Sequence, residues 1–303
     1  MNRLGFRVLI GLMAMPAALL AEGPTAPQFF ANNTVEYIPG TLPIIIAAPH
    51  GGQLEPTDIP DRKSGVVTRD AETDLLARDL AEAITRRTGS RPHLVVCHLK
   101  RSKVDCNRDA LTGTGGNPKA LATWRAFHES IAKARTSNGR GLFLDLHGHS
   151  HPEARVEFGY LLDPEQLRGT AAELEALAPV SSLASLMKTS PDPFESLLRG
   201  PFSLGGLLEL EGFPSVPSPS RADPGDQPYF RGGYNTARYR AGGGADAFFS
   251  VQIECPRAGV RDTEANRKRF AEAMAVVLEK YLERHAGLRL RTPPSGVPRG
   301  GSE

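Results

Sequence analysis

Two histidines follow apolar runs that are typical of buried strands. His50 follows the run IIIAA and lies in the tetrapeptide PHGG. His147 is the last residue of the run LFLDLH. Because ligands in open α/β sheets bind beyond the carboxyl ends of the strands, the two imidazoles can converge on one point. A catalytic zinc site commonly combines two or three histidines with a carboxylate and leaves one position for water. The two histidines together therefore predict a hydrolytic site with one Zn²⁺ per chain.

The third metal ligand should be a carboxylate, and two residues could supply it. Gln53 has the three-residue spacing from His50 that many zinc hydrolases use, but its amide is a poor ligand. Asp70 precedes a predicted helix, where it could instead be an N-cap, and Glu55 follows His50 by five residues. We favour Asp70 over Glu55 as the third ligand.

A carboxylate, Glu254, ends the apolar run FFSVQI. An unpaired charge is costly to bury at the end of such a strand, so a role in the site is favoured over that of a surface carboxylate. At a zinc site, Glu254 could take a proton from the activated water and deliver it to a leaving amine.

Two arginines and an asparagine follow the apolar run LVVC. The planar guanidinium group suits a carboxylate or a developing oxyanion, so Arg101, Asn107 and Arg108 could recognise an acidic amide substrate beside the metal. The alternative is structural ion pairing with Asp105 or Asp109.

Two more histidines lie directly after His147. We expect His149 to bind substrate or to orient the site. We interpret His151 as a solvated side chain.

These residues need a sheet that brings strand ends together. Apolar runs without alternation predict strands buried on both faces, and helical periodicity recurs between them. The expected strands are 42–48, 94–97, 142–147, 156–162 and 248–254, and the expected helices cover 75–84, 121–131 and 270–281. This alternation predicts an α/β fold with a mixed, largely parallel central sheet flanked by helices. The long segment 212–244, rich in Gly and Pro, is expected to be a functional loop.

The amino terminus has the pattern of an export signal. Arg3 and Arg7 precede a short apolar segment that ends before Ala21, which predicts a cleaved signal peptide over 1–21 and a periplasmic or extracellular location; an uncleaved anchor is the alternative. No later segment is apolar enough over a sufficient length to span a bilayer. We expect a single catalytic domain over 24–290 and a disordered tail over 291–303.

Charge and cysteine content exclude two classes of protein. The 303 residues contain 36 Lys and Arg against 34 Asp and Glu, so nucleic acid is not an expected partner. Three cysteines cannot form a closed disulfide framework. Cys97 and Cys106 are close in sequence, and buried free thiols are favoured over a disulfide between them. The oligomeric state is not indicated.

In this order, the segments PHGG, DCNR (with an Arg seven residues before its own Arg), DLHGHS and VQIE resemble the N-formylglutamate amidohydrolase family, within the zinc carboxypeptidases and aspartoacylases. The segments GPFSLGGLL and YFRGGYNTARY resemble those of secreted members of this family. The resemblance spans about residues 42–285. It implies a three-layer fold like that of the zinc carboxypeptidases.

The resemblance also implies a metal site. His50 and His147 would be zinc ligands, and Asp70 resembles the acidic-x-x-Thr element that supplies the carboxylate ligand in relatives. Gln53 departs from the His-x-x-Glu spacing of carboxypeptidases and aspartoacylases.

Roles for four other residues follow from the same resemblance. Arg101 would polarise the scissile carbonyl, Asn107 and Arg108 would hold the substrate's carboxylate, and Glu254 would be the general base and acid. The expected function is a secreted zinc amidohydrolase that acts on an acyl amino acid or an acidic peptide. The alternatives are a zinc carboxypeptidase or cell-wall peptidase of the same fold, and a non-catalytic periplasmic binding protein.

Overall fold

The computed structural model of the protein describes residues 26–240 and 247–291. The predicted signal peptide lies outside the described residues, and so does the predicted tail apart from Arg291. Among the described residues, we find no helix with the length and apolar character that crossing a membrane requires.

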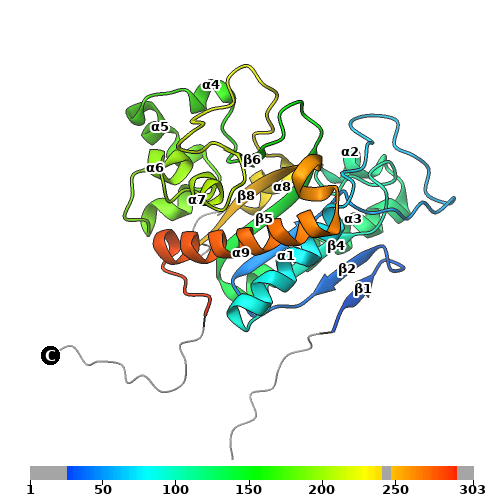
Figure 1. Ribbon diagram of the computed structural model, residues 1–303. Helices are drawn as coiled ribbons and strands as arrows, with labels where there is room; N and C mark the ends of the chain where they lie inside the picture. Colours follow the sequence, from blue (N-terminus) through cyan, green and yellow to red (C-terminus); the bar gives the residue numbers. More distant parts are fainter. Residues whose placement is uncertain (1–25, 241–246, 292–303) are drawn as a thin grey trace, which may run out of the picture.

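One eight-stranded sheet forms the centre of the molecule, in the order β1-β2-β4-β3-β5-β8-β6-β7 (Figure 1). Its strands are β1 (Gln28–Phe30), β2 (Val35–Ile38), β3 (Ile44–Ala48), β4 (His93–Cys97), β5 (Arg140–His149), β6 (Val156–Gly159), β7 (Ser215–Val216) and β8 (Ala247–Pro256). The four central strands, β4, β3, β5 and β8, run parallel, whereas β1, β2 and β6 pair with antiparallel neighbours. The sheet is mixed and largely parallel, as predicted.

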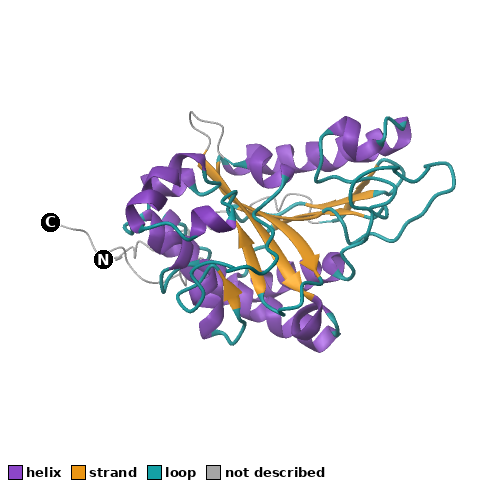
Figure 2. Ribbon diagram, turned by 90° about the horizontal axis from the view of Figure 1, so that it is seen from above, coloured by secondary structure: helices purple, strands orange, loops and turns teal. Residues whose placement is uncertain are grey.

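Helices cover both faces of the sheet (Figure 2). They are α1 (Thr73–Thr88), α2 (Ala110–Thr114), α3 (Pro118–Asn138), α4 (Pro164–Leu167), α5 (Ala171–Leu177), α6 (Phe194–Arg199), α7 (Leu204–Leu210), α8 (Tyr234–Tyr239) and α9 (Glu264–Ala286). The long helices α1, α3 and α9 coincide with the three predicted from periodicity. Helix α3 begins where a helix should, because Asn117 accepts hydrogen bonds from two amides of the first turn and Pro118 needs no donor there.

Strand β3 shows how the two faces of the sheet are buried. Ile44 and Ile46 belong to the core shared with α1 and α9, whereas Ile45 and Ala47 pack into a second core with α3. Side chains alternate between the faces of a strand, so a strand covered on both sides must be apolar throughout. This burial on both faces is the reason that the residues before His50 form a continuous apolar run.

The structure also shows the conformation of the long Gly- and Pro-rich segment and the state of the three cysteines. Segment 212–244 is mostly irregular within its described part, but it contains β7 and α8. Cys97, Cys106 and Cys255 are buried free thiols.

Candidate metal centre and active-site cavity

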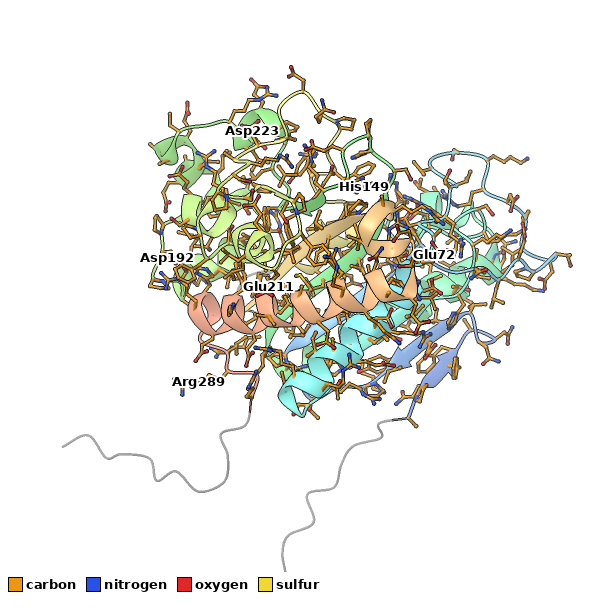
Figure 3. The ribbon with its side chains drawn as sticks, viewed as in Figure 1. Glu72, His149, Asp192, Glu211, Asp223 and Arg289 are labelled. Atoms are coloured by element: carbon orange, nitrogen blue, oxygen red, sulfur yellow. The ribbon has the colours of Figure 1, made fainter. Side chains whose placement is uncertain are left out.

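The carboxyl ends of β3, β5 and β8 bring the predicted chemistry to one edge of the sheet. His147 in β5 pairs with Glu254 in β8, and Ala47 in β3 pairs with Asp145 in β5. His50 follows β3 by two residues. Figure 3 shows His149 and Glu72 near this end of the central strands, whereas Asp192 lies on the far side of the molecule.

The glycines after His50 let the chain pass through a narrow gap. A Cβ atom on Gly51 would lie 2.4 Å from the backbone nitrogen of Asp74, and one on Gly52 would lie 2.3 Å from the carbonyl carbon of His98. A side chain on Gly51 would push this segment away from the first turn of α1. The amide of Asp70, just before that helix, donates to the carbonyl of His50 at 3.2 Å. The PHGG motif therefore places His50 beside Asp70.

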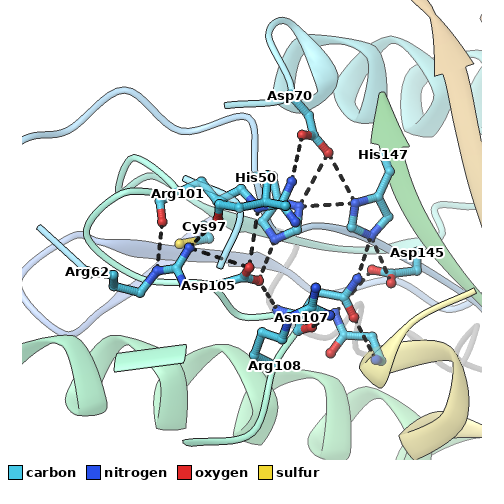
Figure 4. Close-up of polar contacts among 12 residues, drawn as sticks. His50, Arg62, Asp70, Cys97, Arg101, Asp105, Asn107, Arg108, Asp145 and His147 are labelled. Atoms are coloured by element: carbon cyan, nitrogen blue, oxygen red, sulfur yellow. Dashed lines mark hydrogen bonds and ion pairs between the residues drawn. The ribbon is translucent and has the colours of Figure 1, made fainter. Parts of the chain in front are cut away.

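His50, Asp70 and His147 converge on one point (Figure 4). The Nδ1 atoms of the two histidines are 3.1 Å apart. Oδ2 of Asp70 lies 3.3 Å from Nδ1 of His50 and 3.2 Å from Nδ1 of His147. All three side chains are buried. The structure thus brings together the two histidines and the carboxylate favoured from the sequence.

Each imidazole is held from behind by a second carboxylate. Nε2 of His50 lies 2.7 Å from Oδ1 of Asp105, and Nε2 of His147 lies 2.9 Å from Oδ2 of Asp145. Because an ionised carboxylate can only accept hydrogen bonds, Nε2 of His50 carries the donated proton, and in a neutral imidazole its Nδ1 keeps a lone pair. At His147, Asp145 acts as a charged neighbour rather than a hydrogen-bond partner, and Nδ2 of Asn107 lies 3.3 Å from the same Nε2. Metal-binding histidines in proteins have this arrangement almost without exception.

The three facing atoms fit a metal ion. Lone pairs at these separations repel one another unless positive charge lies between them. Burial acts to lower the pKa of His147, but Asp145 and Asp70 outweigh it and raise that pKa well above its usual value, which shows that the surroundings attract positive charge. Ligand atoms about 2.0–2.1 Å from a tetrahedral zinc ion are about 3.3 Å from one another. The observed triangle is close to that size, so the three residues could hold such an ion.

Asp70, and not Glu55, is the carboxylate at this point. Glu55 is exposed and pairs with Lys100. Asp70 is not the N-cap of α1, a position that Glu72 occupies, and its Oδ2 also accepts a hydrogen bond from the amide of Gly148 at 3.3 Å. The N-cap interpretation of Asp70 is therefore not what the structure shows.

Arg101 bridges the two carboxylates that flank His50. Its Nη1 donates to Oδ1 of Asp70 at 3.1 Å, and its Nε donates to Oδ2 of Asp105 at 3.3 Å. Burial acts to raise the pKa of Asp105, but His50 and Arg101 outweigh it and hold the carboxyl ionised. The ion pairing with Asp105 that the sequence left open is present, and Arg101 also faces the cavity described next. Its action on a substrate carbonyl stays a prediction.

A cavity of about 680 Å³ opens beside Asp70 and His147. This volume is in the range of small-molecule sites. Six arginines line it, against the carboxylates of Asp70 and Glu254. The arginines are Arg69, Arg101, Arg108, Arg231, Arg257 and Arg261. Three of them, Arg108, Arg231 and Arg261, form no ion pair within the described part of the chain. Arg261 donates to three backbone carbonyls, so Arg108 and Arg231 are the cationic groups available to an anionic ligand.

Glu254 projects a buried, partly unsatisfied carboxyl group at the cavity wall. Its Oε1 accepts a hydrogen bond from Nε2 of Gln252 at 2.9 Å, while its Oε2 is buried without a partner among the described residues. Burial raises the pKa of Glu254 to about 8. A carboxyl group in this condition can exchange protons near neutral pH, which suits a general base and acid.

Asn107 and His149 line the cavity, but both are largely engaged within the protein. Oδ1 of Asn107 accepts the amide of Asn235 at 2.8 Å. Nε2 of His149 donates to the carbonyl of Arg155 at 2.8 Å, and Nδ1 accepts from the amide of His151 at 3.1 Å. Substrate binding by these two side chains stays a prediction.

Several residues of the site were not anticipated in these roles. From the sequence, Asp105 was considered only as an ion-pair partner. In the structure its Oδ1 also accepts a hydrogen bond from the amide of Asn107, two residues later, at 2.9 Å, which is a turn contact typical of aspartate. Arg231 and Asn235 lie in segment 212–244. The sequence indicated them only indirectly, because a long irregular loop is often functional.

Comparison with known proteins gives a structural match only. No protein family model and no curated protein matches the sequence. An N-formylglutamate amidohydrolase from Ralstonia eutropha matches 84% of this chain and 99% of its own, with 15% identity and a TM-score of 0.50. A gene product of Agrobacterium tumefaciens covers 84% and 98%, with 14% identity and a TM-score of 0.49. A succinylglutamate desuccinylase from Chromobacterium violaceum covers 85% and 70%, with 12% identity and a TM-score of 0.37.

At 15% identity, the first of these matches establishes the fold and nothing finer. The chain therefore shares the α/β fold of a solved N-formylglutamate amidohydrolase, in agreement with the resemblance that its motifs carry.

Proposed function

We propose that this protein is a zinc-dependent amidohydrolase that cleaves an amide bond of an acyl amino acid or an acidic peptide. The observation that supports the proposal most strongly is the triangle of His50, Asp70 and His147 next to the unsatisfied carboxyl group of Glu254. A zinc ion bound there would supply Lewis acidity to the scissile carbonyl.

The side chains of the cavity can perform the remaining steps. Glu254 takes a proton from the attacking water. Arg101, at the cavity wall, is placed to stabilise negative charge on the carbonyl oxygen. Arg108 and Arg231 bind a carboxylate of the substrate, for which the guanidinium group is well shaped.

Export is a second part of the proposal. The basic start and short apolar segment of 1–21 support a cleaved signal peptide and a periplasmic or extracellular site of action. N-terminal sequencing of the protein recovered from its native compartment tests this. A mature chain that begins close to Glu22 supports export, and an intact Met1 contradicts cleavage.

The activity is tested with zinc-loaded protein and a panel of N-formyl, N-acetyl and N-succinyl amino acids, set beside short acidic peptides. Release of a free amine is measured. We expect hydrolysis of acidic members of the panel, and we expect Glu254→Gln to lose about 10²- to 10⁴-fold in kcat while it retains its metal. Peptides cleaved in preference to acyl amino acids would indicate the peptidase alternative. Equal behaviour of wild type and Glu254→Gln would indicate a binding protein.

A further inference from the structure

A second group of titratable side chains lies in the same cavity as the metal cluster. His149, His151 and Glu157 each offer an atom within 4.8 Å of the others. Glu157 is fully buried, and the side chain of His151 is 16% exposed. Both histidines line the cavity. Neither His151 nor Glu157 has a role in the function proposed above.

This second group is not built as a metal site. Nε2 of His149 is a donor to the carbonyl of Arg155, and its Nδ1 lone pair is taken by the amide of His151. A metal ion would have to displace one of these bonds. Among the three residues, only the pair of His151 and Glu157 remains open to another use.

Glu157 fixes the proton of His151 on one ring nitrogen. Nδ1 of His151 lies 2.9 Å from Oε1 of Glu157, and Oε2 of Glu157 accepts the amide of Phe230 at 3.0 Å. Nε of Arg155 lies 3.6 Å from Oε1. The amide of Phe230 and the guanidinium of Arg155 both favour a carboxylate at Glu157, and because a carboxylate can only accept, His151 donates from Nδ1. Nε2 of His151 has no partner among the described residues.

Two aromatic contacts hold the ring of His151 in this orientation. Its centroid lies 4.6 Å from that of His149 and 4.7 Å from that of Phe230. A solvated surface histidine, which is how we interpreted His151 from the sequence, has no such support. The sequence interpretation of this residue is therefore corrected by its packing.

Strand register places this pair next to Glu254. Glu157 in β6 pairs with Glu254 in β8, and Glu254 pairs with His147 in β5. Paired residues of neighbouring strands project from the same face, so the three side chains form one row across the sheet. Glu254 lies between the metal cluster on one side and the pair of Glu157 and His151 on the other.

We propose that His151, oriented by Glu157, is a second acid–base residue of this cavity. A buried carboxylate that fixes one nitrogen of an imidazole and leaves the other free toward a cavity is the arrangement by which proteins prepare histidine for proton transfer. The proton transfer by His151 rests on the amide cleavage proposed above, whereas its orientation by Glu157 does not.

In that step the C–N bonding pair moves to the departing nitrogen, which takes the proton from Nε2 of protonated His151. Glu254 holds the proton removed from the attacking water and releases it to solvent, and His151 regains one from solvent. One water is consumed for each amide bond broken, and the charge of the site is restored.

The orientation of the pair is tested first, without any substrate. Diethyl pyrocarbonate acylates accessible imidazole nitrogens, and peptide mass spectrometry gives the rate at each histidine. We expect His151 to be labelled, and labelling to slow in Glu157→Gln. His98 is the matched control, because its Nε2 lies 3.0 Å from Oε2 of Glu36, outside the cavity. Failure of His151 to react while His98 is labelled would overturn the proposal.

The catalytic role is tested with His151→Gln and His98→Gln. We expect His151→Gln to lose about 10²- to 10⁴-fold in kcat on an alkyl amide with its zinc content unchanged, and His98→Gln to match wild type. The loss in His151→Gln should be far smaller on the corresponding p-nitrophenyl ester, whose phenolate leaves without a proton.

Equal losses on both substrates, or a change in KM alone, would show that His151 does not donate a proton. If the wild type cleaves no amide at all, the amidohydrolase proposal fails, while the labelling experiment still decides whether the pair exists.

Discussion

The Nδ1 atoms of His50 and His147 face each other at 3.1 Å, and each imidazole has a carboxylate behind its other nitrogen. Two rings remote in the chain share this geometry because the ends of β3 and β5 are adjacent in the sheet. Protein groups occupy the Nε2 side of each ring, which leaves the Nδ1 sides for a cation.

The carboxylate behind His50 should control metal affinity. In Asp105→Asn the amide no longer fixes the Nε2 proton of His50, so we expect zinc affinity to fall about 10- to 100-fold. Competition with a chromophoric chelator measures the Kd. Asp109→Asn is the control, because Asp109 caps the short helix α2 through the amides of Leu111 and Thr112. Equal zinc affinity of Asp105→Asn and wild type would contradict the role of Asp105.

Arg108 should set the preference for acidic substrates. Its guanidinium group lines the cavity without an ion pair among the described residues, so its replacement removes a charged hydrogen bond to the substrate. Such a bond contributes about 1.5–3 kcal/mol, so KM for an acidic acyl amino acid should rise about 10- to 100-fold in Arg108→Met with little change in kcat.

A neutral acyl amino acid is the control substrate, and we expect its KM to change much less. If both substrates lose equally, Arg108 supports the fold of the site rather than the recognition of charge.

Gly148 should tolerate no side chain. A Cβ atom there would lie 2.4 Å from Cζ of Arg261, whose buried guanidinium donates to the carbonyls of Cys255 and His149 at 3.0 Å and to that of Ala71. We expect Gly148→Ala to lose about 1–3 kcal/mol of unfolding free energy, because the core cannot expand to accept the methyl group.

Denaturant titration measures this loss. Gly169→Ala is the control, since its Cβ atom would meet nothing closer than 3.1 Å. A denaturation midpoint for Gly148→Ala equal to that of wild type would show that the side chain of Arg261 can move aside.

His128 should make stability depend on pH. Burial lowers the pKa of His128 from 6.5 to about 3, and its Nδ1 lies 2.5 Å from the hydroxyl of Tyr239. The unfolded chain therefore binds a proton below about pH 6.5 that the folded chain does not. Its contribution to stability is complete above pH 6.5 and is lost as pH falls toward 3.

The difference in unfolding free energy between wild type and His128→Gln isolates this contribution from that of the titrating carboxylates. We expect the difference to shrink as pH falls from 7 to 4. A difference that stays constant over this range would show that His128 is not buried in its neutral form.

Much of the fold and the centre of the site could be predicted from local patterns. Parallel strands covered on both faces are apolar throughout, and the residues after them lie at one edge of the sheet, so the sequence alone pairs His50 with His147. The sequence favoured Asp70 over Glu55 only slightly. The choice depends on the path of the loop before α1, which local sequence specifies weakly.

The surroundings of the site could not be predicted in the same way. The contacts of Asp145 with His147 and of Glu157 with His151 depend on rotamers and on the register of β6 against β8. Arg231 reaches the cavity from a loop whose path is fixed by tertiary contacts. His151 was interpreted as solvated because a histidine in a polar segment has no local signal of burial.

Metal analysis of the purified protein shows whether His50, Asp70 and His147 hold a zinc ion. Wild type, His147→Ala and Asp109→Asn are loaded with zinc, dialysed and measured by inductively coupled plasma mass spectrometry. We expect about one zinc ion per chain in wild type and Asp109→Asn, and almost none in His147→Ala. Wild type that retains no zinc, or His147→Ala that retains as much as wild type, would contradict this expectation.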